Sequence, residues 1–345
     1  MAFVRIGRSD LANFRWGGGF KGRIQLTHKF EEIISVENLL SAWQEFIKGK
    51  RSKPDVQEFG FNLMDNILLL REELTSKRYI HGHYYRFNIS DPKPRVIHKA
   101  DVRDRLLHHA THRVLYPFFA KTFISDSFSC QIDKGMHRAI NRFRSFTYKV
   151  SKNHTKTCWV LKCDIKKFFN SIGHKVLLKI LESYITDKNI IWLLERIISS
   201  FSVVAGKGLP LGNLTSQLFS NIYMNELDQF IKHRLKIKNY IRYADDFAIL
   251  SDSKTWLLDL ISIIGDFLEK NLKLSLHPKK VFIKTIASGV DFLGWVHFSD
   301  HRFLRTTTRR RMMKRIAENP NNETLQSYLG LLKHGNTYKI REKLL

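Results

Sequence analysis

The sequence predicts an α+β protein in which amphipathic helices are interspersed with short strands. Apolar residues recur every three to four positions over 30–50 and again over 61–79, as in helices with one buried face. Residues 157–169 read as a strand with side chains that alternate between two faces up to Asp164, and 241–250 places two apolar runs around a polar tip, as in a hairpin. Both periodicities occur in one chain of 345 residues, which indicates a mixed fold with a sizeable core.

The remaining elements follow from the same patterns and from turn residues. The proline-containing turn "SDPKP" divides two alternating runs and predicts a hairpin over 84–100. Thr215 and Ser216 are both good helix caps, and they predict a long helix that opens at one of them. Further elements are expected in this order: a helix over 101–119, a helix over 256–272, strand-like segments over 272–285 and 289–298, and a basic, helical remainder.

The charge balance points to a polyanionic partner. Lys and Arg number 58 against 32 Asp and Glu, which gives a formal net charge of +26. The excess is spread along the chain from Arg5 to Lys343 rather than confined to one tail. A distributed excess of this size predicts a long polyanion, most simply nucleic acid. The alternative, a positive surface that only serves solubility, needs far less net charge.

Cysteine usage and hydropathy bound the cellular setting. Cys130, Cys158 and Cys163 show no CxxC spacing and leave an odd count, so neither a disulfide framework nor a cysteine zinc site is expected. This fits the reducing cytoplasm of a prokaryote. The longest apolar stretch, 190–204, is interrupted by charges and falls short of a membrane span, so no membrane partner is expected. Residues 1–26 form a basic, glycine-interrupted arm without a signal-peptide core.

Three carboxylates carry the main chemical signal. Asp164 ends the predicted strand, and Asp245 and Asp246 stand side by side at the tip of the predicted hairpin. Adjacent like charges repel, so the pair costs stability unless a cation offsets it. Three carboxylates from two neighbouring strands can hold two Mg²⁺ ions about 3.5–4 Å apart, which activates an attacking 3′ hydroxyl and stabilises a leaving pyrophosphate. The alternative is a solvated turn, because aspartate favours turns.

The order of these residues along the chain and the motifs around them resemble those of the reverse transcriptase palm. The palm-like motifs are "DIKKFFNSI" (164–172), "GLPLGNLTSQ" (208–217) and "YADD" (243–246). Three more segments extend the resemblance: "DPKPRVI" (91–97) in the fingers, "HPKK" (277–280) near the incoming nucleotide and "DFLGW" (291–295) as the primer grip. The resemblance spans roughly residues 30–345, and several ordered motifs with correct spacing make it specific.

The resemblance implies a right-hand polymerase fold with fingers, a palm made of an antiparallel sheet backed by helices, and a short helical thumb. The chain would then divide into a basic arm at 1–26, fingers at 27–155, palm at 156–288, primer grip at 289–302 and thumb at 303–345. The implied activity is that of an RNA-directed DNA polymerase, a nucleotidyltransferase that needs divalent metal ions.

The resemblance also assigns catalytic and nucleotide-binding roles. Asp164 and Asp245 would ligate two Mg²⁺ ions, with Mn²⁺ as a substitute, and Asp246 would be a weaker or second-shell ligand. Phe169 matches the aromatic steric gate that excludes a 2′ hydroxyl, although a plain core aromatic is its alternative. Arg95 matches the fingers arginine that clamps the triphosphate, a role suited to a planar, always charged guanidinium.

Further positions would contact nucleotide, template and primer. Lys280, or its neighbour Lys279, matches the lysine that donates a proton to pyrophosphate, while Leu211 and Gly212 would lie against the nascent base pair. Template and primer contacts are expected at Ser216, Gln217, Tyr243, Phe292, Leu293 and Gly294. The implied partners are an RNA template, an RNA/DNA primer-template, deoxynucleoside triphosphates, and either a small basic accessory protein or a structured noncoding RNA.

The lineage within the family stays open between two readings. Leu211, in place of a glutamine, and the segment 327–341 resemble reverse transcriptases of diversity-generating retroelements, which copy template adenines with errors. Gln131 and Ile132 depart from that family's Arg-Pro, which puts mutagenic retrohoming in doubt. The runner-up is a defence-associated, anti-phage reverse transcriptase that uses a noncoding RNA, and the arm at 1–26 fits it slightly better. A remote alternative is a catalytically inactive RNA-binding relic.

Overall fold

The computed structural model describes residues 23–90 and 94–344 and is an α+β protein. The described chain forms two compact units. Unit 1 comprises the described residues up to Phe123 together with Lys167–Lys236, and unit 2 comprises Ile124–Lys166 and the described residues from Ile237 onward. Most of the predicted arm at 1–26 and the turn residues 91–93 lie outside the described residues.

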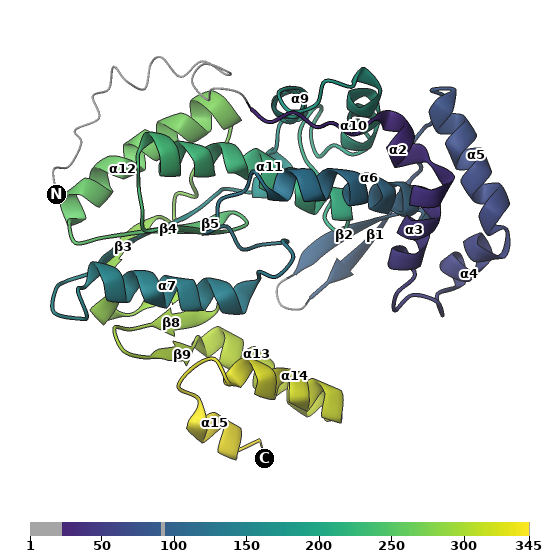
Figure 1. Ribbon diagram of the computed structural model, residues 1–345. Coiled ribbons are helices and arrows are strands. Elements are labelled where there is room, and N and C mark those ends of the chain that lie inside the picture. Colours follow the sequence, from purple (N-terminus) through teal and green to yellow (C-terminus); the bar gives the residue numbers. More distant parts are fainter. Residues whose placement is uncertain (1–22, 91–93, 345) are drawn as a thin grey trace. The chain divides into compact units, whose positions relative to one another are not determined.

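Unit 1 is mainly helical. Its elements are α2 (Phe30–Ile34), α3 (Val36–Phe46), α4 (Pro54–Phe61), α5 (Leu63–Thr75), β1 (Tyr84–Ile89), β2 (Arg95–Ala100), α6 (Val102–Ala120), α8 (Phe168–Ser171), α9 (His174–Glu182), α10 (Lys188–Ser199), α11 (Leu214–Gln229) and a π-helical extension at Phe230–Arg234. Strands β1 and β2 form the predicted antiparallel hairpin. Helix α11 is buried along most of its length, and it packs against α6 (Figure 1).

Unit 2 contains the main sheet and the C-terminal helices. Its elements are α7 (Met136–Val150), β3 (Trp159–Asp164), β4 (Tyr240–Tyr243), β5 (Asp246–Ser251), α12 (Lys254–Phe267), a π-helical turn at Leu268–Leu272, β6 (Phe282–Thr285), a 3₁₀ turn at Ile286–Ser288, β7 (Val290–Phe292), β8 (Trp295–His297), β9 (Arg302–Leu304), α13 (Thr306–Glu318), α14 (Asn322–Leu332) and α15 (Tyr338–Glu342). The first sheet has the antiparallel order β4-β5-β3-β6, and β7, β8 and β9 form a second.

The four-stranded sheet is covered by one helix on each face, α7 on one and α12 on the other (Figure 1). Alternation along β3 decides what each face carries. Val160 joins an apolar cluster with Phe143 of α7, whereas Leu161 lies on the opposite face, where it is equally buried. Lys162 and Asp164 continue the Val160 face toward the end of the strand. The polar end of this face is therefore placed by the same packing that forms the core.

Several predicted boundaries move because local caps compete with periodicity. The predicted helix at 30–50 breaks at Ser35, whose side-chain oxygen accepts a hydrogen bond from the amide of Asn38 and starts α3 anew. Helix α11 has Asn213 as its N-cap, so the predicted start at Thr215 or Ser216 is wrong by at least two residues. Of the strand-like segment 272–285, the last four residues alone form a named strand.

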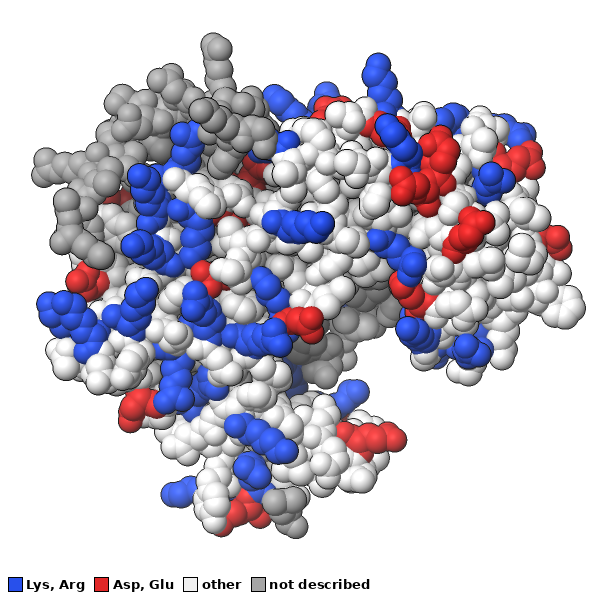
Figure 2. All heavy atoms as spheres, viewed as in Figure 1, with Lys and Arg blue, Asp and Glu red and all other residues white. Residues whose placement is uncertain are grey.

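The compact units do not follow the predicted functional divisions, which stay predictions. Residues 124–155 of the predicted fingers belong to unit 2, and residues 167–236 of the predicted palm belong to unit 1. Lys and Arg side chains are spread over the viewed surfaces of both units rather than gathered in one patch (Figure 2). Within the described ranges, every helix is too short or too polar to cross a lipid bilayer.

Candidate active site

The end of β3 and the tip of the β4–β5 hairpin meet in unit 2. Strand β3 pairs with β5 so that Asp164 lies directly opposite Asp246, and β4 pairs with β5 so that Tyr243 also lies opposite Asp246. The turn between them contains Ala244 at φ +56°, a left-handed conformation that a two-residue turn demands. Residues directly opposite one another in antiparallel strands project to the same face. The register therefore brings Asp164 and Asp246 side by side, with Asp245 adjoining in the turn.

Two lysines neutralise these carboxylates. Lys280 Nζ lies 3.1 and 3.0 Å from the two Asp164 carboxylate oxygens, and Lys162 Nζ lies 3.2 Å from Asp246 Oδ2. Burial, together with the nearby Asp164 and Asp245, raises the pKa of Asp246 to about 6 even though Lys162 acts to lower it. Asp246 Oδ1 is buried and has no hydrogen-bond partner among the described residues. The site therefore contains a carboxylate oxygen, Asp246 Oδ1, that neither lysine pairs with.

The donor chemistry fits hard divalent cations. Carboxylate oxygens are what Mg²⁺ prefers, and the unpartnered Oδ1 of Asp246 is a buried acceptor with nothing else to satisfy it. Across residues 23–90 and 94–344, however, no three His, Cys, Asp or Glu side chains are grouped closely enough to hold an ion as they stand. Ligation by Asp164, Asp245 and Asp246 thus remains a prediction, and it requires the lysine ion pairs to open.

The segment that carries Lys280 is tied to the end of β3 by its backbone. The amide of His277 donates to the Asp164 carbonyl at 2.8 Å, and the amide of Lys166 donates to the Ser275 carbonyl at 3.0 Å. These contacts run along both sides of Asp164. Of the two candidate lysines, Lys280 is the one whose ammonium group contacts the Asp164 carboxylate, so Lys280 is favoured over Lys279.

A buried arginine that the sequence did not single out supports the β4–β5 turn. Arg242 in β4 is fully buried, and its guanidinium donates to the Ala244 carbonyl at 3.0 Å and to Ser127 Oγ at 2.9 Å. Gln131 Nε2 in turn donates to the carbonyl and hydroxyl oxygens of Ser127, each at 3.0 Å. An arginine within an otherwise apolar strand was the available signal. Ser127 therefore links Gln131 to Arg242 in the interior of unit 2.

The predicted nucleotide-binding residues of unit 1 occupy three places. Arg95 is the first residue of β2 and is exposed; Phe169 in α8 is half-buried and meets Phe168 edge to face at 5.4 Å. The Leu211 carbonyl accepts a hydrogen bond from the amide of His98 at 2.9 Å. Gly212 has φ +117°, and a Cβ there would lie 2.8 Å from a methyl carbon of Ile97. Strand β2 thus fixes the loop that precedes α11.

The predicted template and primer contacts differ in exposure. In α11, Ser216 is buried and Gln217 is exposed. Phe292 is wholly buried and stacks on Phe143 at 4.9 Å, so its side chain belongs to the core. Leu293 and Gly294 form the β7–β8 turn, both with positive φ. Tyr243 is half-buried, and burial raises the pKa of its hydroxyl.

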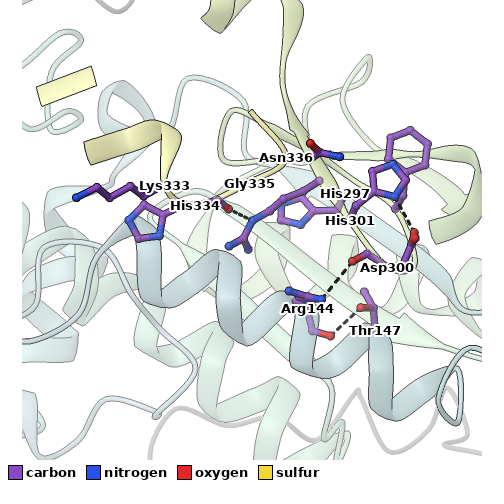
Figure 3. Close-up of a pocket in the computed structure, with 11 residues that line it drawn as sticks. Arg144, Thr147, His297, Asp300, His301, Lys333, His334, Gly335 and Asn336 are labelled. Atoms are coloured by element: carbon purple, nitrogen blue, oxygen red, sulfur yellow. Dashed lines mark hydrogen bonds and ion pairs between the residues drawn. The ribbon is translucent and has the colours of Figure 1, made fainter. Parts of the chain in front are cut away.

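A separate cavity of about 300 Å³ lies in unit 2 near the C-terminal helices (Figure 3). Arg144 and Thr147 of α7 form one wall, and Arg144 donates to the Asp300 carbonyl at 3.2 Å. The His334 ring stacks on His137 of α7 at 3.7 Å, and the His334 carbonyl accepts a hydrogen bond from Arg302. These contacts join α7, β8–β9 and the segment after α14, so the cavity is part of the packing of unit 2.

Comparison with known proteins gives a consistent family assignment. A family profile described as "Reverse transcriptase (RNA-dependent DNA polymerase)" matches residues 90–297. Protein YkfC of Escherichia coli (strain K12) is 26% identical over 292 residues, which cover 73% of this chain and 74% of that protein. The group II intron-encoded protein LtrA of Lactococcus lactis subsp. cremoris is 22% identical over 282 residues.

The extent of these matches differs. The LtrA alignment covers 61% of this chain and 45% of LtrA. The putative COX1/OXI3 intron 2 protein of Saccharomyces cerevisiae is 24% identical over 207 residues, which cover 42% of this chain and 24% of that protein. This chain therefore spans less than half the length of these two intron proteins, but about three quarters of YkfC.

Proposed function

Because the chain belongs to the reverse transcriptase (RNA-dependent DNA polymerase) family, we propose that it copies a dedicated RNA template into cDNA by two-metal nucleotidyl transfer. The observation that carries the mechanism is the β3–β5 register, which sets Asp164 opposite Asp246 beside the turn residue Asp245. The partners of such an enzyme are an RNA template, a primer and deoxynucleoside triphosphates.

The proposed chemistry divides between the ions and the chain. When bound, two Mg²⁺ ions would activate the primer 3′ hydroxyl and stabilise the charge that develops on the leaving pyrophosphate. Asp164 and Asp245 would hold them, with Asp246 as a further ligand. Lys162 and Lys280 pair with Asp246 and Asp164. Lys280 would leave Asp164 to donate a proton to pyrophosphate. Arg95 would clamp the triphosphate, and Phe169 would exclude the 2′ hydroxyl.

For the biological role we propose error-prone cDNA synthesis in a diversity-generating retroelement, supported by Leu211 and by the thumb-like segment 327–341. One observation favours the second role, anti-phage defence with a noncoding RNA. Gln131 occupies the position of that retroelement family's arginine but carries no positive charge for a phosphate. Its side-chain amide donates to Ser127 instead. An accessory protein would suit the first role, and a structured noncoding RNA the second.

Primer extension on an RNA template tests the activity. We expect incorporation of deoxynucleotides with Mg²⁺ and its loss with excess EDTA. No incorporation on any RNA template, with either Mg²⁺ or Mn²⁺, would instead favour the RNA-binding relic. Sequencing of the nucleic acid that copurifies with the protein then separates the two roles. Repeat-derived cDNA with changes at template adenines supports the retroelement, and one structured RNA with its cDNA supports defence.

A further inference from the structure

A buried hydrogen-bond chain crosses unit 1 from α6 to the start of α11. His81 Nδ1 lies 3.3 Å from Asp104 Oδ2, His81 Nε2 lies 3.2 Å from His108 Nε2, and His108 Nδ1 lies 3.1 Å from Thr215 Oγ1. Asp104, His108 and Thr215 are 0, 2 and 1% exposed, and the His81 side chain is 3% exposed. Water does not reach these groups, so each proton must be assigned within the chain of residues.

The Asp104 end fixes the proton of His81. His81 Nδ1 faces oxygen acceptors, the Gly82 carbonyl at 2.8 Å and the Asp104 carboxylate, so it carries a hydrogen. Asp104 is itself held by the Tyr79 hydroxyl at 2.9 Å and the Gly82 amide at 2.7 Å. A neutral His81 therefore has its lone pair on Nε2 and can only accept there.

The hydroxyl of Tyr84, 3.2 Å from His81 Nε2, has a nearer partner in Ser200 Oγ at 2.8 Å. Ser200 donates its own proton to the Ile197 carbonyl at 2.7 Å, so its oxygen accepts from Tyr84. This leaves His108 to supply the proton between the two rings. Two lone pairs would otherwise face each other at 3.2 Å.

His108 then has a single neutral form that satisfies both neighbours. Its Nε2 carries the hydrogen and donates to His81, so its Nδ1 accepts from the Thr215 hydroxyl. Burial, together with the nearby His81 and His109, lowers the pKa of His108 well below its usual range, which keeps this ring neutral. With His81 neutral, the direction of every hydrogen bond from Asp104 to Thr215 follows.

We propose that His81 and His108 are positioning residues that fix Thr215, and through it the segment Leu211–Gln217, for selection of the incoming nucleotide. The role rests on the proposed polymerase function. Thr215 follows the predicted nucleotide contacts Leu211 and Gly212 and precedes the predicted template contacts Ser216 and Gln217. The histidine pair holds the helix side of this segment, while the His98 amide and Ile97 hold the loop side. Ile97 and His98 belong to β2, the strand that begins with Arg95.

The first test reads the histidine protons in the full-length protein without any assay of activity. Nitrogen-15 NMR of ring-labelled histidine at pH 8 distinguishes a protonated from an unprotonated ring nitrogen. We expect the hydrogen on Nδ1 of His81 and on Nε2 of His108. The opposite assignment on either ring overturns the proton chain, whether or not the protein polymerises nucleotides.

The second test compares threonine variants that remove or keep the side-chain hydroxyl. Thr215→Val removes the donor, Thr215→Ser keeps it, and Thr111→Val makes the same change at a buried threonine of α6 whose hydroxyl has no partner among the described residues. Loss of one buried hydrogen bond predicts a KM for the correct deoxynucleotide about tenfold higher in Thr215→Val, with kcat within about twofold. Its preference for correct over incorrect nucleotides should fall, while both other variants stay near wild type.

Equal effects of Thr215→Val and Thr215→Ser on KM overturn the positioning role, as does an effect of Thr111→Val as large as that of Thr215→Val. The proposed function fails in a different way. A wild-type protein that incorporates no nucleotide removes the kinetic test, and with it the nucleotide-selection role, but the NMR assignment still decides the proton chain.

Discussion

The carboxylate cluster of unit 2 and the histidine chain of unit 1 differ in how their polar groups are satisfied. In unit 2, the carboxylates of Asp164 and Asp246 pair with the ammonium groups of Lys280 and Lys162. In unit 1, His81 and His108 are satisfied by directed hydrogen bonds. A lysine ammonium on a flexible stem can exchange partners, whereas a buried chain of directed hydrogen bonds has one arrangement. The first cluster suits exchange with metal ions, and the second suits fixed geometry.

The difference is also energetic. Partly exposed ion pairs such as those of unit 2 contribute little to stability, so their presence argues for a role beyond folding. In unit 1 the buried Asp104 carboxylate is held by the Tyr79 hydroxyl and the Gly82 amide, and these hydrogen bonds offset the cost of its burial. Substitutions in the two clusters should therefore damage different properties, activity in unit 2 and nucleotide selection in unit 1.

The largest expected effect is the loss of a carboxylate. Asp164→Ala or Asp245→Ala should lower primer extension by roughly 10³-fold or more, because metal ligands act mainly on the transition state. Binding of the RNA template, measured by filter retention, should stay close to wild type. Asp252→Ala, an exposed carboxylate just after β5, is the control and should keep activity. A parallel fall in RNA binding would make the two carboxylates structural.

Next in size is the change in sugar preference at Phe169. Replacement by Val removes the ring that would block a 2′ hydroxyl, so ribonucleotide incorporation should rise roughly 10- to 100-fold relative to deoxynucleotide incorporation. Phe169→Tyr keeps the ring and should keep the preference. The ratio of kcat/KM for the two sugars is the measurement, and an unchanged ratio in the Val variant removes Phe169 from the steric gate.

A smaller effect sharpens the role of the lysines. Lys162→Met leaves Asp246 without its neighbouring cation, so in EDTA the unfolding free energy should fall by about 1–3 kcal/mol. Added Mg²⁺ should restore more stability to this variant than to the wild type, since the ion replaces the missing charge. Urea unfolding with and without Mg²⁺ measures both. If Mg²⁺ stabilises the variant and the wild type equally, the Lys162 ammonium group does not occupy a metal-ion position.

The smallest effect is a pH dependence that arises from buried histidine. Burial lowers the pKa of His297 to about 3, while an unfolded histidine titrates near 6.5. The unfolded chain binds the proton first as pH falls, so this contribution to stability is complete above about pH 6.5 and is lost toward pH 3. Between pH 6.5 and 5.5 the loss from one such histidine is about 1 kcal/mol.

Replacement of His297 by Phe should remove that share of the pH dependence in urea titrations at the two pH values. His233→Gln, at an exposed position, is the control and should leave the dependence as it is in the wild type. Equal slopes for the wild type and His297→Phe would mean that His297 does not stay neutral in the folded protein.

The sequence predicted what local patterns determine. Period-two alternation placed Asp164 at the end of a strand, and the apolar runs around Asp245 gave the hairpin. Sequence could not supply the register across β3 and β5, so the ion pair between Lys162 and Asp246 was not expected. Phe292 is predicted at the primer because its motif resembles a primer grip; its side chain lies in the core, which the motif alone did not indicate, and the primer contact stays a prediction.

The histidine chain escaped prediction for a related reason. Asp104 and His108 share α6, four residues apart, but His81 precedes β1 and Thr215 lies in α11, and no local pattern relates these three segments to one another. The strong cap residue Thr215 also misplaced the start of α11, because the helix begins at Leu214 with Asn213 as its N-cap. Partners far apart along the chain are fixed by packing, which is a property of the folded units and not of any single segment.

The most direct test of the account is the position of Mn²⁺ in crystals of the protein with an RNA template, a primer and a non-reactive deoxynucleotide analogue. Anomalous scattering locates the ions without assumptions about the side chains. The account predicts two peaks about 3.5–4 Å apart, ligated by Asp164 and Asp245, with Lys280 no longer on Asp164. A bound nucleotide with Lys280 still paired to Asp164 and no Mn²⁺ at these carboxylates would contradict it.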